Sequence, residues 1–135
     1  GDLYVLVVTK PHKFFKRDGA NLYCRVPIPM MTAALGGTIE VPSIDGSRNN
    51  VDIKAGTQTG QQLRLKSKGM NIMRSDSRGD LYIEIFVETP VNLNGKQKDL
   101  MKKLADDLGT DNNGHSPESS SFMQKMKDIW TDLKN

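Results

Sequence analysis

The sequence is poor in the residues that make disulfides, metal sites and membrane spans. One of its 135 residues is a cysteine, Cys24, which excludes an internal disulfide and a cysteine-rich zinc site. Its two histidines, His12 and His115, lie far apart with no metal-ligand pattern nearby, so no metal or other cofactor is expected. No apolar run approaches the roughly 18 residues of a transmembrane helix. We expect a protein of the reducing cytoplasm that does not enter a membrane.

Aromatic residues are also scarce, at 6% of the chain, and none occurs between Cys24 and Leu81. The basic excess of this chain, whose formal charge is +3, gathers in the same stretch. Lysines and arginines there could bind phosphates, but no ring lies among them to stack on a base. Nucleic-acid binding is therefore disfavoured, and RNA binding is kept as a rival hypothesis. The basic residues are Arg64, Lys66, Lys68, Arg74 and Arg78.

The sequence contains no arrangement typical of an active site. No serine or cysteine has a companion base at a recognisable spacing, and the acidic residues are scattered singly between basic ones. The segment from Gly56 to Gly60 (GTQTG) superficially suggests a phosphate loop, but no Gly-Lys-Ser/Thr follows it. A hairpin turn explains this segment better, and an enzyme is not expected.

Apolar alternation predicts a mainly β fold. The strands are expected at residues 3–9, 22–28, 38–44, 51–55, 62–68 and 81–89. Turn signals separate them, and their spacing is typical of a small two-sheet, β-sandwich-like domain. Residues 12–21 are expected to form a loop that turns at Asp18-Gly19. Residues 30–35 (MMTAAL) predict one short internal helix that ends at Gly36-Gly37.

Two prolines mark strand 22–28 as unusual. Pro27 and Pro29 cannot donate a hydrogen bond to a neighbouring strand, so we expect this strand to be an edge or a bulge. Extended peptides bind to such edges and place alternate side chains in apolar pockets. The residues able to line a groove of this kind are apolar and alternate along the strands. They are Val26, Ile28, Val41, Ile44, Ile83 and Ile85. The same six residues are equally the pattern of a plain core, and the sequence favours that reading for each of them.

The chain changes character after Pro90. Asn94-Gly-Lys-Gln97 resembles a capping box and starts an amphipathic helix whose apolar stripe is Leu100, Met101, Leu104 and Leu108. Residues 110–119 have the composition of a flexible linker, and a second amphipathic helix is expected over 120–135. Bare apolar stripes are unusual in a water-soluble protein, so the first helix is expected to form a homodimer contact. The second helix could pack on the sheet or on another chain.

The order of short motifs resembles a known family. They are Pro11-His12-x-x-Phe15-x-Arg17-x-Gly19-x-Asn21-Leu22-Tyr23, Val26-Pro27-Ile28, Ala33-Ala34-Leu35-Gly36-Gly37, Val41-Pro42, Asp45-Gly46, Gly56-Thr57-Gln58-Thr59-Gly60, Arg64-Leu65-Lys66-x-Lys68-Gly69, and Gly79-Asp80-Leu81-Tyr82 through Glu88-Thr89-Pro90. Together they strongly resemble the C-terminal, client-binding region of the bacterial DnaJ family of J-domain co-chaperones. The residues GDLY occur at the start of the chain and again at 79–82.

The resemblance implies a domain plan. Residues 1–11 would be the last strand of a preceding β-domain, 12–90 a second β-domain, and 91–109 a dimerisation helix. No His-Pro-Asp tripeptide or Cys-x-x-Cys repeat occurs, so neither the J-domain nor the zinc region of the family is present in this sequence. Ala55 stands where the family often has proline.

The function implied by the resemblance is that of a co-chaperone fragment. It would bind unfolded polypeptide clients through an apolar groove or edge strand, dimerise, and support client delivery to a DnaK-type chaperone. The alternative is a purely structural dimerisation module that binds no client.

Overall fold

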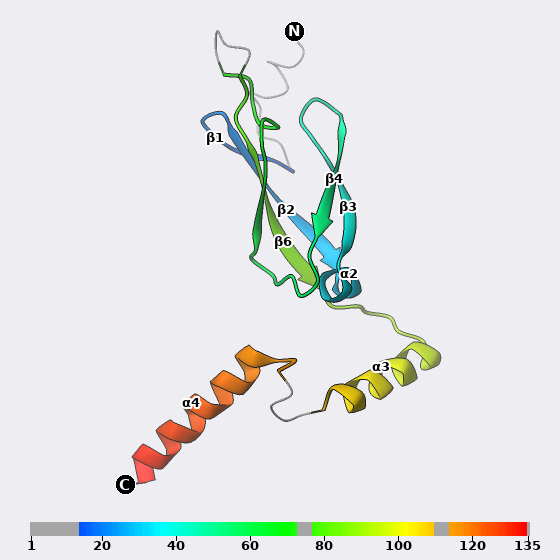
Figure 1. The fold of residues 1–135 in the computed structure, drawn as a ribbon, viewed down its shortest axis with the longest axis vertical. Helices are drawn as coiled ribbons and strands as arrows, with labels where there is room; N and C mark the ends of the chain where they lie inside the picture. Colours follow the sequence, from blue (N-terminus) through cyan, green and yellow to red (C-terminus); the bar gives the residue numbers. More distant parts are fainter. Residues whose placement is uncertain (1–13, 73–76, 110–113, 135) are drawn as a thin grey trace. The chain divides into compact units, whose positions relative to one another are not determined.

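The computed structural model describes residues 14–72, 77–109 and 114–134 in two units, one ending at Pro90 and one beginning at Val91. The expected strand 3–9, together with His12 and Arg74, lies outside the described residues. Within its described residues, the β-unit contains six strands and one short helix (Figure 1). They are β1 Lys16–Asp18, β2 Asn21–Pro29, α2 Met30–Leu35, β3 Gly37–Pro42, β4 Arg48–Ile53, β5 Gln62–Leu65 and β6 Leu81–Glu88.

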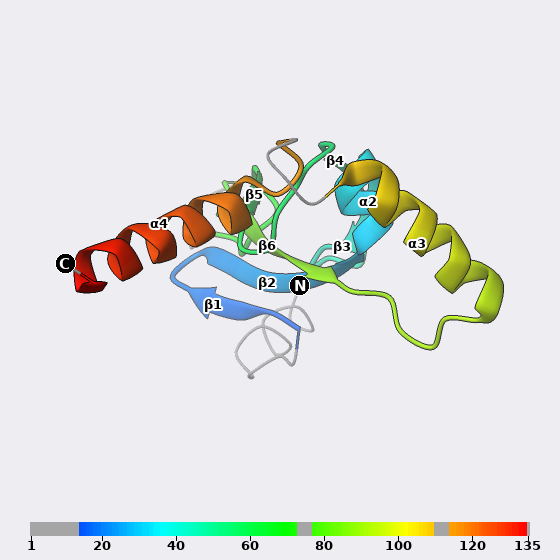
Figure 2. The ribbon, with the colours of Figure 1, turned by 90° about the horizontal axis from the view of Figure 1, so that it is seen from below.

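The strands form two sheets, as the alternation predicts. The larger one, here called sheet A, has the order β1-β2-β6-β5, and the smaller one, sheet B, is the hairpin β3-β4. In sheet A, β2 and β6 run parallel with Leu22 opposite Leu81, while β1 and β5 are antiparallel to their neighbours. Figure 2 shows β1 folded back along the start of β2. The fold is a small β-sandwich-like domain with one internal helix.

Two local expectations are wrong. The sequence predicts a loop over residues 12–21 that turns at Asp18-Gly19. The turn is present, with Gly19 at a φ of 61°, but Lys16–Asp18 forms β1 and pairs with Asn21–Tyr23. The segment 56–60 is not a hairpin turn, because β4 before it and β5 after it belong to different sheets. It crosses from sheet B to sheet A and is held by the Gly60 N–H, which donates to the Ile85 carbonyl at 2.8 Å.

The core lies between the two sheets. Leu22, Cys24 and Ile28 of β2 and Leu81, Ile83 and Ile85 of β6 face Val41, Val51 and Ile53 of sheet B, and Phe15, Ala33 and Met70 complete the cluster. Along β2 and β6 every second side chain is buried or partly buried against this core, which is the period that a strand with one covered face requires. Sheet A therefore has a buried inner face and an outer face of its own.

A close approach of three backbone segments anchors the start of β6. A Cβ on Gly79 would lie 2.0 Å from the Ala20 carbonyl oxygen, and a Cβ on Gly69 would lie 2.5 Å from the same atom. The Met70 N–H donates to this oxygen at 2.8 Å, and the Leu22 N–H donates to the Asp80 carbonyl at 2.9 Å. Gly79 is thus required by packing, because any side chain at this position would overlap the Ala20 backbone.

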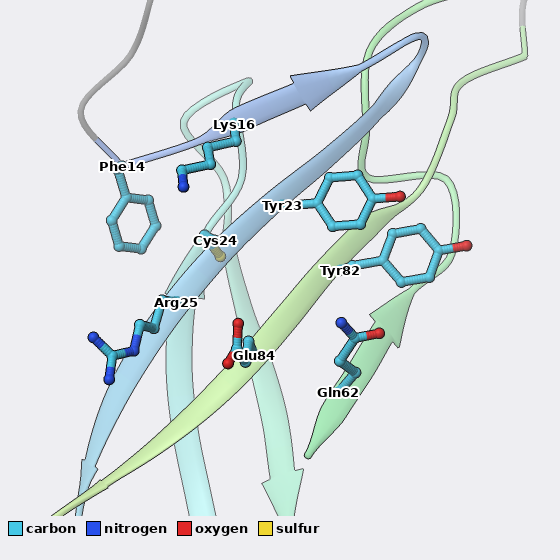
Figure 3. A pocket seen from close by; sticks show the side chains of 8 residues that line it. All are labelled: Phe14, Lys16, Tyr23, Cys24, Arg25, Gln62, Tyr82 and Glu84. Carbon is cyan, nitrogen blue, oxygen red and sulfur yellow. The ribbon is translucent and has the colours of Figure 1, made fainter. Parts of the chain in front are cut away.

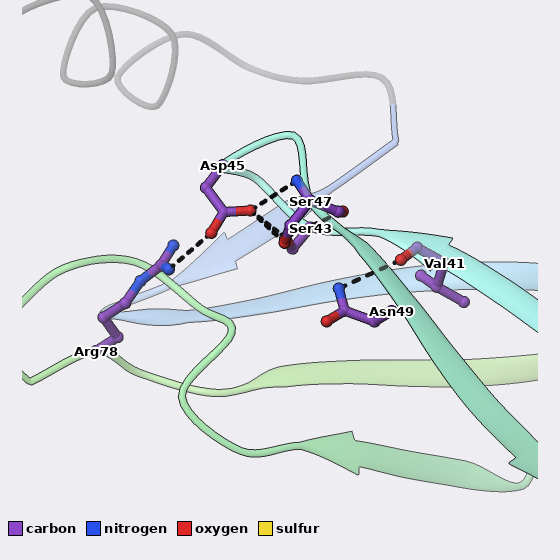
Figure 4. A network of polar contacts seen from close by, with 6 residues as sticks. All are labelled: Val41, Ser43, Asp45, Ser47, Asn49 and Arg78. Carbon is purple, nitrogen blue, oxygen red and sulfur yellow. Dashed lines mark hydrogen bonds and ion pairs between the residues drawn. The ribbon is translucent and has the colours of Figure 1, made fainter.

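A polar network joins the hairpin of sheet B to the loop before β6 (Figure 4). The Asp45 carboxylate accepts hydrogen bonds from the hydroxyls of Ser43 and Ser47 and from the Ser47 N–H at 2.9 Å. Its other oxygen accepts from Arg78 at 3.2 Å. The Ser43 hydroxyl, the Ser47 groups and Arg78 together hold the pKa of Asp45 well below its usual value of 3.8.

The described part of the second unit contains two helices, α3 Gly95–Leu108 and α4 Pro117–Lys134. The predicted capping box is present, because the Asn94 side chain accepts from the Gln97 N–H and the Gln97 side chain accepts from the Asn94 N–H, both at 2.9 Å. Helix α4 begins three residues before the expected start at Ser120. Proline suits a first helical position because its missing N–H has no helical partner there, and Pro117 therefore starts the helix.

Candidate functional site

The outer face of sheet A carries aromatic and charged side chains from all four of its strands. The register places Lys16, Tyr23 and Tyr82 in one cross-strand row, because Lys16 pairs with Tyr23 and Tyr23 with Tyr82. The next rows on this face hold Arg25 beside Glu84 and Pro27 beside Phe86. Strand β5 adds Gln62 and Arg64.

The rings on this face are stacked in an ordered way. Tyr23 and Tyr82 are stacked with their centroids 5.1 Å apart and their planes 13° from parallel. The Arg25 guanidinium lies over the Phe86 ring, 4.1 Å from its centroid, which is within the range of a cation–π contact. Both contacts are cross-strand and fix the orientation of three half-buried rings and of the exposed Arg25 side chain.

A hollow of about 330 Å³ opens on this face (Figure 3). The residues that line it combine aromatic rings with groups of both charges, and they come from β1, β2, β5, β6 and the residues just before β1. They are Phe14, Lys16, Tyr23, Cys24, Arg25, Gln62, Tyr82 and Glu84. Figure 3 shows the two tyrosine rings side by side, with Arg25 and Glu84 further along the strands. Such a surface can hold an apolar side chain on the rings and hydrogen-bond a polar backbone beside it.

The Cys24 thiol of the hollow is expected to be unreactive. Cys24 is 5% exposed, and burial raises its pKa to about 11. A thiol with this pKa stays protonated at neutral pH and is a poor nucleophile. Cys24 is therefore a packing residue, as its place in strand 22–28 predicts.

The edge of β2 lies next to the hollow. The Leu22 N–H donates toward β6, so the main-chain groups of residues 22, 24, 26 and 28 face β6 and those of 23, 25, 27 and 29 face the other way. Within residues 14–72 and 77–90, β1 covers this second side only as far as Tyr23. Pro27 and Pro29 occupy positions whose N–H would point to the uncovered side, which explains how both fit in a fully paired β2–β6 ladder.

Most of the residues predicted to line a client groove lie in the core instead. Ile28 and Val41 are 1% exposed and Ile83 and Ile85 are fully buried, so a docked chain could not contact these four without opening the sandwich. Val26 and Ile44 are partly buried and pack against the same core. The structure brings all six together on the inner side of the sheets. This agrees with the alternative interpretation of the pattern, in which these residues form the core.

The basic residues from Arg64 to Arg78 are partly neutralised by ion pairs. Arg64 binds Asp80 through two nitrogen atoms, each 2.6 Å from the same carboxylate oxygen, and Arg78 binds Asp45. The Ser67 N–H, followed by Arg64, holds the pKa of Asp80 below its usual value. These arginines hold loops together, which weakens the case for a phosphate-binding surface.

The stripe predicted for dimerisation is exposed on α3. Leu100 and Leu104 are 55% and 45% exposed, while Met101 and Leu108 are half-buried. Helix α4 likewise exposes Phe122, Ile129, Trp130 and Leu133. Among the described residues of α3 and α4, none is buried. The second unit therefore presents apolar side chains that its own residues leave uncovered.

In the described part of the chain, no three His, Cys, Asp or Glu side chains come together as a set that could hold a metal ion. Neither is any helix among the described residues long and apolar enough to cross a membrane.

Comparison with known proteins identifies the class. Residues 1–90 match the family described as DnaJ C terminal domain, and residues 96–132 match the family described as Chaperone protein DnaJ C-terminal region. The chain belongs to the DnaJ C-terminal domain family. The first match spans the β-unit, and the second covers nearly all of both helices.

Several curated relatives carry the name Chaperone protein DnaJ. The protein of Rhodospirillum centenum is 59% identical over 135 residues, which is all of this chain and 35% of that protein. The proteins of Paramagnetospirillum magneticum and Ruegeria pomeroyi are 55% and 54% identical over 134 residues, which is 99% of this chain and 35% and 34% of theirs. The chain thus spans about a third of the length of the relatives it matches.

Proposed function

We propose that this chain is the part of a DnaJ-type co-chaperone that binds non-native polypeptide and joins two protomers. The family supports the co-chaperone role. Because the relatives are about three times as long as this chain, delivery of the bound polypeptide to a DnaK-type chaperone is proposed only for a whole protein of that kind. The two binding roles are assigned here to different units.

The observation that carries polypeptide binding is the hollow beside the edge of β2, which β1 leaves uncovered beyond Tyr23 within the described residues. An unfolded chain exposes apolar side chains and unpaired backbone groups together. The hollow offers the Tyr23 and Tyr82 rings to the first, and the edge offers main-chain groups to the second, as in other sites where a peptide adds to a sheet. Arg25 belongs to both the hollow and the edge of β2, because its side chain lines the hollow and its main-chain groups face the edge.

The prolines of this edge limit how it can be used. Pro27 and Pro29 present carbonyl oxygens but no N–H groups, so a bound chain can donate to the edge there but cannot accept from it. Such an edge is poorly suited to continuous strand addition, which reduces pairing between copies of the protein. We propose that it favours short, reversible contacts with many sequences.

The proposal for dimerisation rests on α3. Its stripe includes two exposed leucines, and a second copy would remove them from water. The alternative function is a structural module in which α3 joins protomers and the β-unit binds no client. The two functions differ only in the activity of the β-unit, so the outer face of sheet A decides between them.

The test is suppression of aggregation of a chemically denatured client by the purified chain. We expect Tyr23→Ser combined with Tyr82→Ser to remove most of the activity, because the stacked rings of the hollow are lost. The matched control, Tyr23→Phe with Tyr82→Phe, keeps both rings and should keep the activity. Circular dichroism checks that both variants stay folded. Equal activity of the serine variant and the parent would contradict client binding at this face, and no activity in the parent would favour the structural module.

A further inference from the structure

The charges of α3 are arranged against its own helix dipole. The first turn carries Lys96 and Lys98 and no acidic residue, and the last turn carries Asp106 and Asp107 and no basic residue. The N-terminus of a helix has a partial positive charge and its C-terminus a partial negative charge. Each end of α3 therefore places charged side chains next to a pole of the same sign, which disfavours the isolated helix. Helix α4 has the usual order, with Glu118 in its first turn and Lys134 in its last.

The end charges lie beside the apolar stripe. Lys96 and Asp107 are eleven residues apart, which is about three helical turns, so they fall on the same flank of α3. The stripe that runs beside them includes the exposed Leu100 and Leu104. A helix that packs on this stripe therefore meets a lysine at one end of the flank and an aspartate at the other.

We propose that two copies of α3 pair in antiparallel orientation, stripe to stripe, with Lys96 of one copy facing Asp107 of the other at each end. This inference rests on the proposed dimerisation and adds its geometry. In an antiparallel pair the same flank of each helix meets, and the first turn of one copy lies beside the last turn of the other. The charges that oppose the dipole within one helix then become complementary to the partner's charges and to the partner's dipole.

The other orientation lacks these contacts. In a parallel pair, the two first turns would place lysines beside lysines, and the two last turns would place aspartates beside aspartates, with the like poles of both helices together. Leu100 and Leu104 of α3 are exposed among the described residues and are therefore available to a second copy. For a pair of α3 helices, the order of the end charges thus selects the antiparallel direction.

Charge reversal tests the orientation in the full chain. In an antiparallel pair, Lys96→Glu with Lys98→Glu places glutamates beside the partner's aspartates. We expect the dissociation constant of the dimer to rise at least about ten-fold at low salt. Adding Asp106→Lys and Asp107→Lys should restore the affinity. The control is Lys102→Glu, whose side chain lies well away from the stripe by the helical spacing and should change little.

The outcomes separate the two levels of the proposal. Analytical ultracentrifugation that shows a weakened double variant and a restored quadruple variant supports antiparallel pairing. A dimer with unchanged affinity in both variants contradicts antiparallel pairing but not dimerisation. In a parallel pair, the substitutions would only replace one like-charge contact with another, so the affinity would not change. A parent chain that is monomeric contradicts the dimerisation itself.

Disulfide trapping gives an independent check. The native Cys24 is buried and should not cross-link, so only the introduced cysteines should react. In the antiparallel pair the two positions 96 are about 16 Å apart along the axis, beyond the roughly 7 Å Cα separation that a disulfide allows. Lys96→Cys alone should therefore not cross-link, whereas an equimolar mixture of Lys96→Cys and Asp107→Cys should. Cross-linking of Lys96→Cys with itself, or none in the mixture, would overturn the antiparallel arrangement.

Discussion

The two units of the chain differ in whether their apolar side chains are buried. In the β-unit, sheets A and B bury a shared core that includes the fully buried Leu81, Ile83 and Ile85. In the helical unit, Leu104, Trp130 and their apolar neighbours stay largely exposed. An apolar pattern identifies the residues that must be removed from water. Only the fold shows whether they are buried within the same chain or need a partner. The β-unit should therefore be stable alone, and the helical unit should depend on a partner.

The largest expected effect breaks the β-unit at Gly79. A Cβ there would overlap the Ala20 carbonyl oxygen at 2.0 Å, so Gly79→Ala must displace backbone and should lower the free energy of unfolding by about 3 kcal/mol. Urea unfolding followed by circular dichroism measures the change. Gly95→Ala is the control, because nothing lies within 4 Å of its added Cβ. A Gly79→Ala variant as stable as the parent would show that the start of β6 can shift freely.

A change in the helical unit should affect association and leave the sheets alone. Leu104→Asp places a charge in the proposed α3 interface and should weaken the dimer by about 3 kcal/mol, since an unpaired buried charge is costly. The unfolding midpoint of the β-unit should stay the same when monomers are compared. Leu104→Met, which conserves volume, should retain the dimer. Unchanged dimer affinity in the aspartate variant would remove Leu104 from the interface.

A smaller effect should sharpen the picture of how sheet B is tied to the rest of the β-unit. Asp45→Asn weakens the network with Ser43, Ser47 and Arg78 and should cost about 1–2 kcal/mol at neutral pH. Because folding lowers the pKa of Asp45, its carboxylate stabilises the fold above its usual pKa of 3.8, and this contribution is lost as the pH falls below that value.

The difference between the parent and Asp45→Asn should therefore shrink below pH 4. Asp52→Asn is the control, since Asp52 is exposed and the hydrogen bond that it accepts from the Thr38 hydroxyl is long, at 3.3 Å. A difference that grows in acid would assign another role to Asp45.

Much of the β-unit follows from local patterns in the sequence. Alternation along β2, β4 and β6 predicts their buried faces, and the Asn94–Gln97 capping box predicts the start of α3, because these features depend on neighbours two to four residues away. The parallel pairing of β2 with β6 depends on residues about sixty positions apart and is not encoded in either strand alone. Strand β1 is only three exposed residues long, so it has no apolar alternation to reveal it.

The candidate site was harder to predict than the fold. The sequence shows no aromatic residue between Cys24 and Leu81, yet Tyr23 and Tyr82 border this gap, and the β2–β6 register stacks them. Leu-Tyr stands at the start of β6 and directly after the first residue of β2, and that shared pair is a usable signal once parallel pairing is considered. Alternation cannot tell a groove from a core, since both require apolar residues on one face, and four of the six predicted groove residues are buried.

The most direct test of this account is the molar mass of the intact chain in solution, measured by light scattering over micromolar concentrations. A chain of 15.0 kDa whose helical unit needs a partner should show twice that mass, and the Leu104→Asp variant should return to the mass of one chain with its sheets folded. A parent chain that stays at 15.0 kDa throughout would contradict the claim that a second copy covers α3.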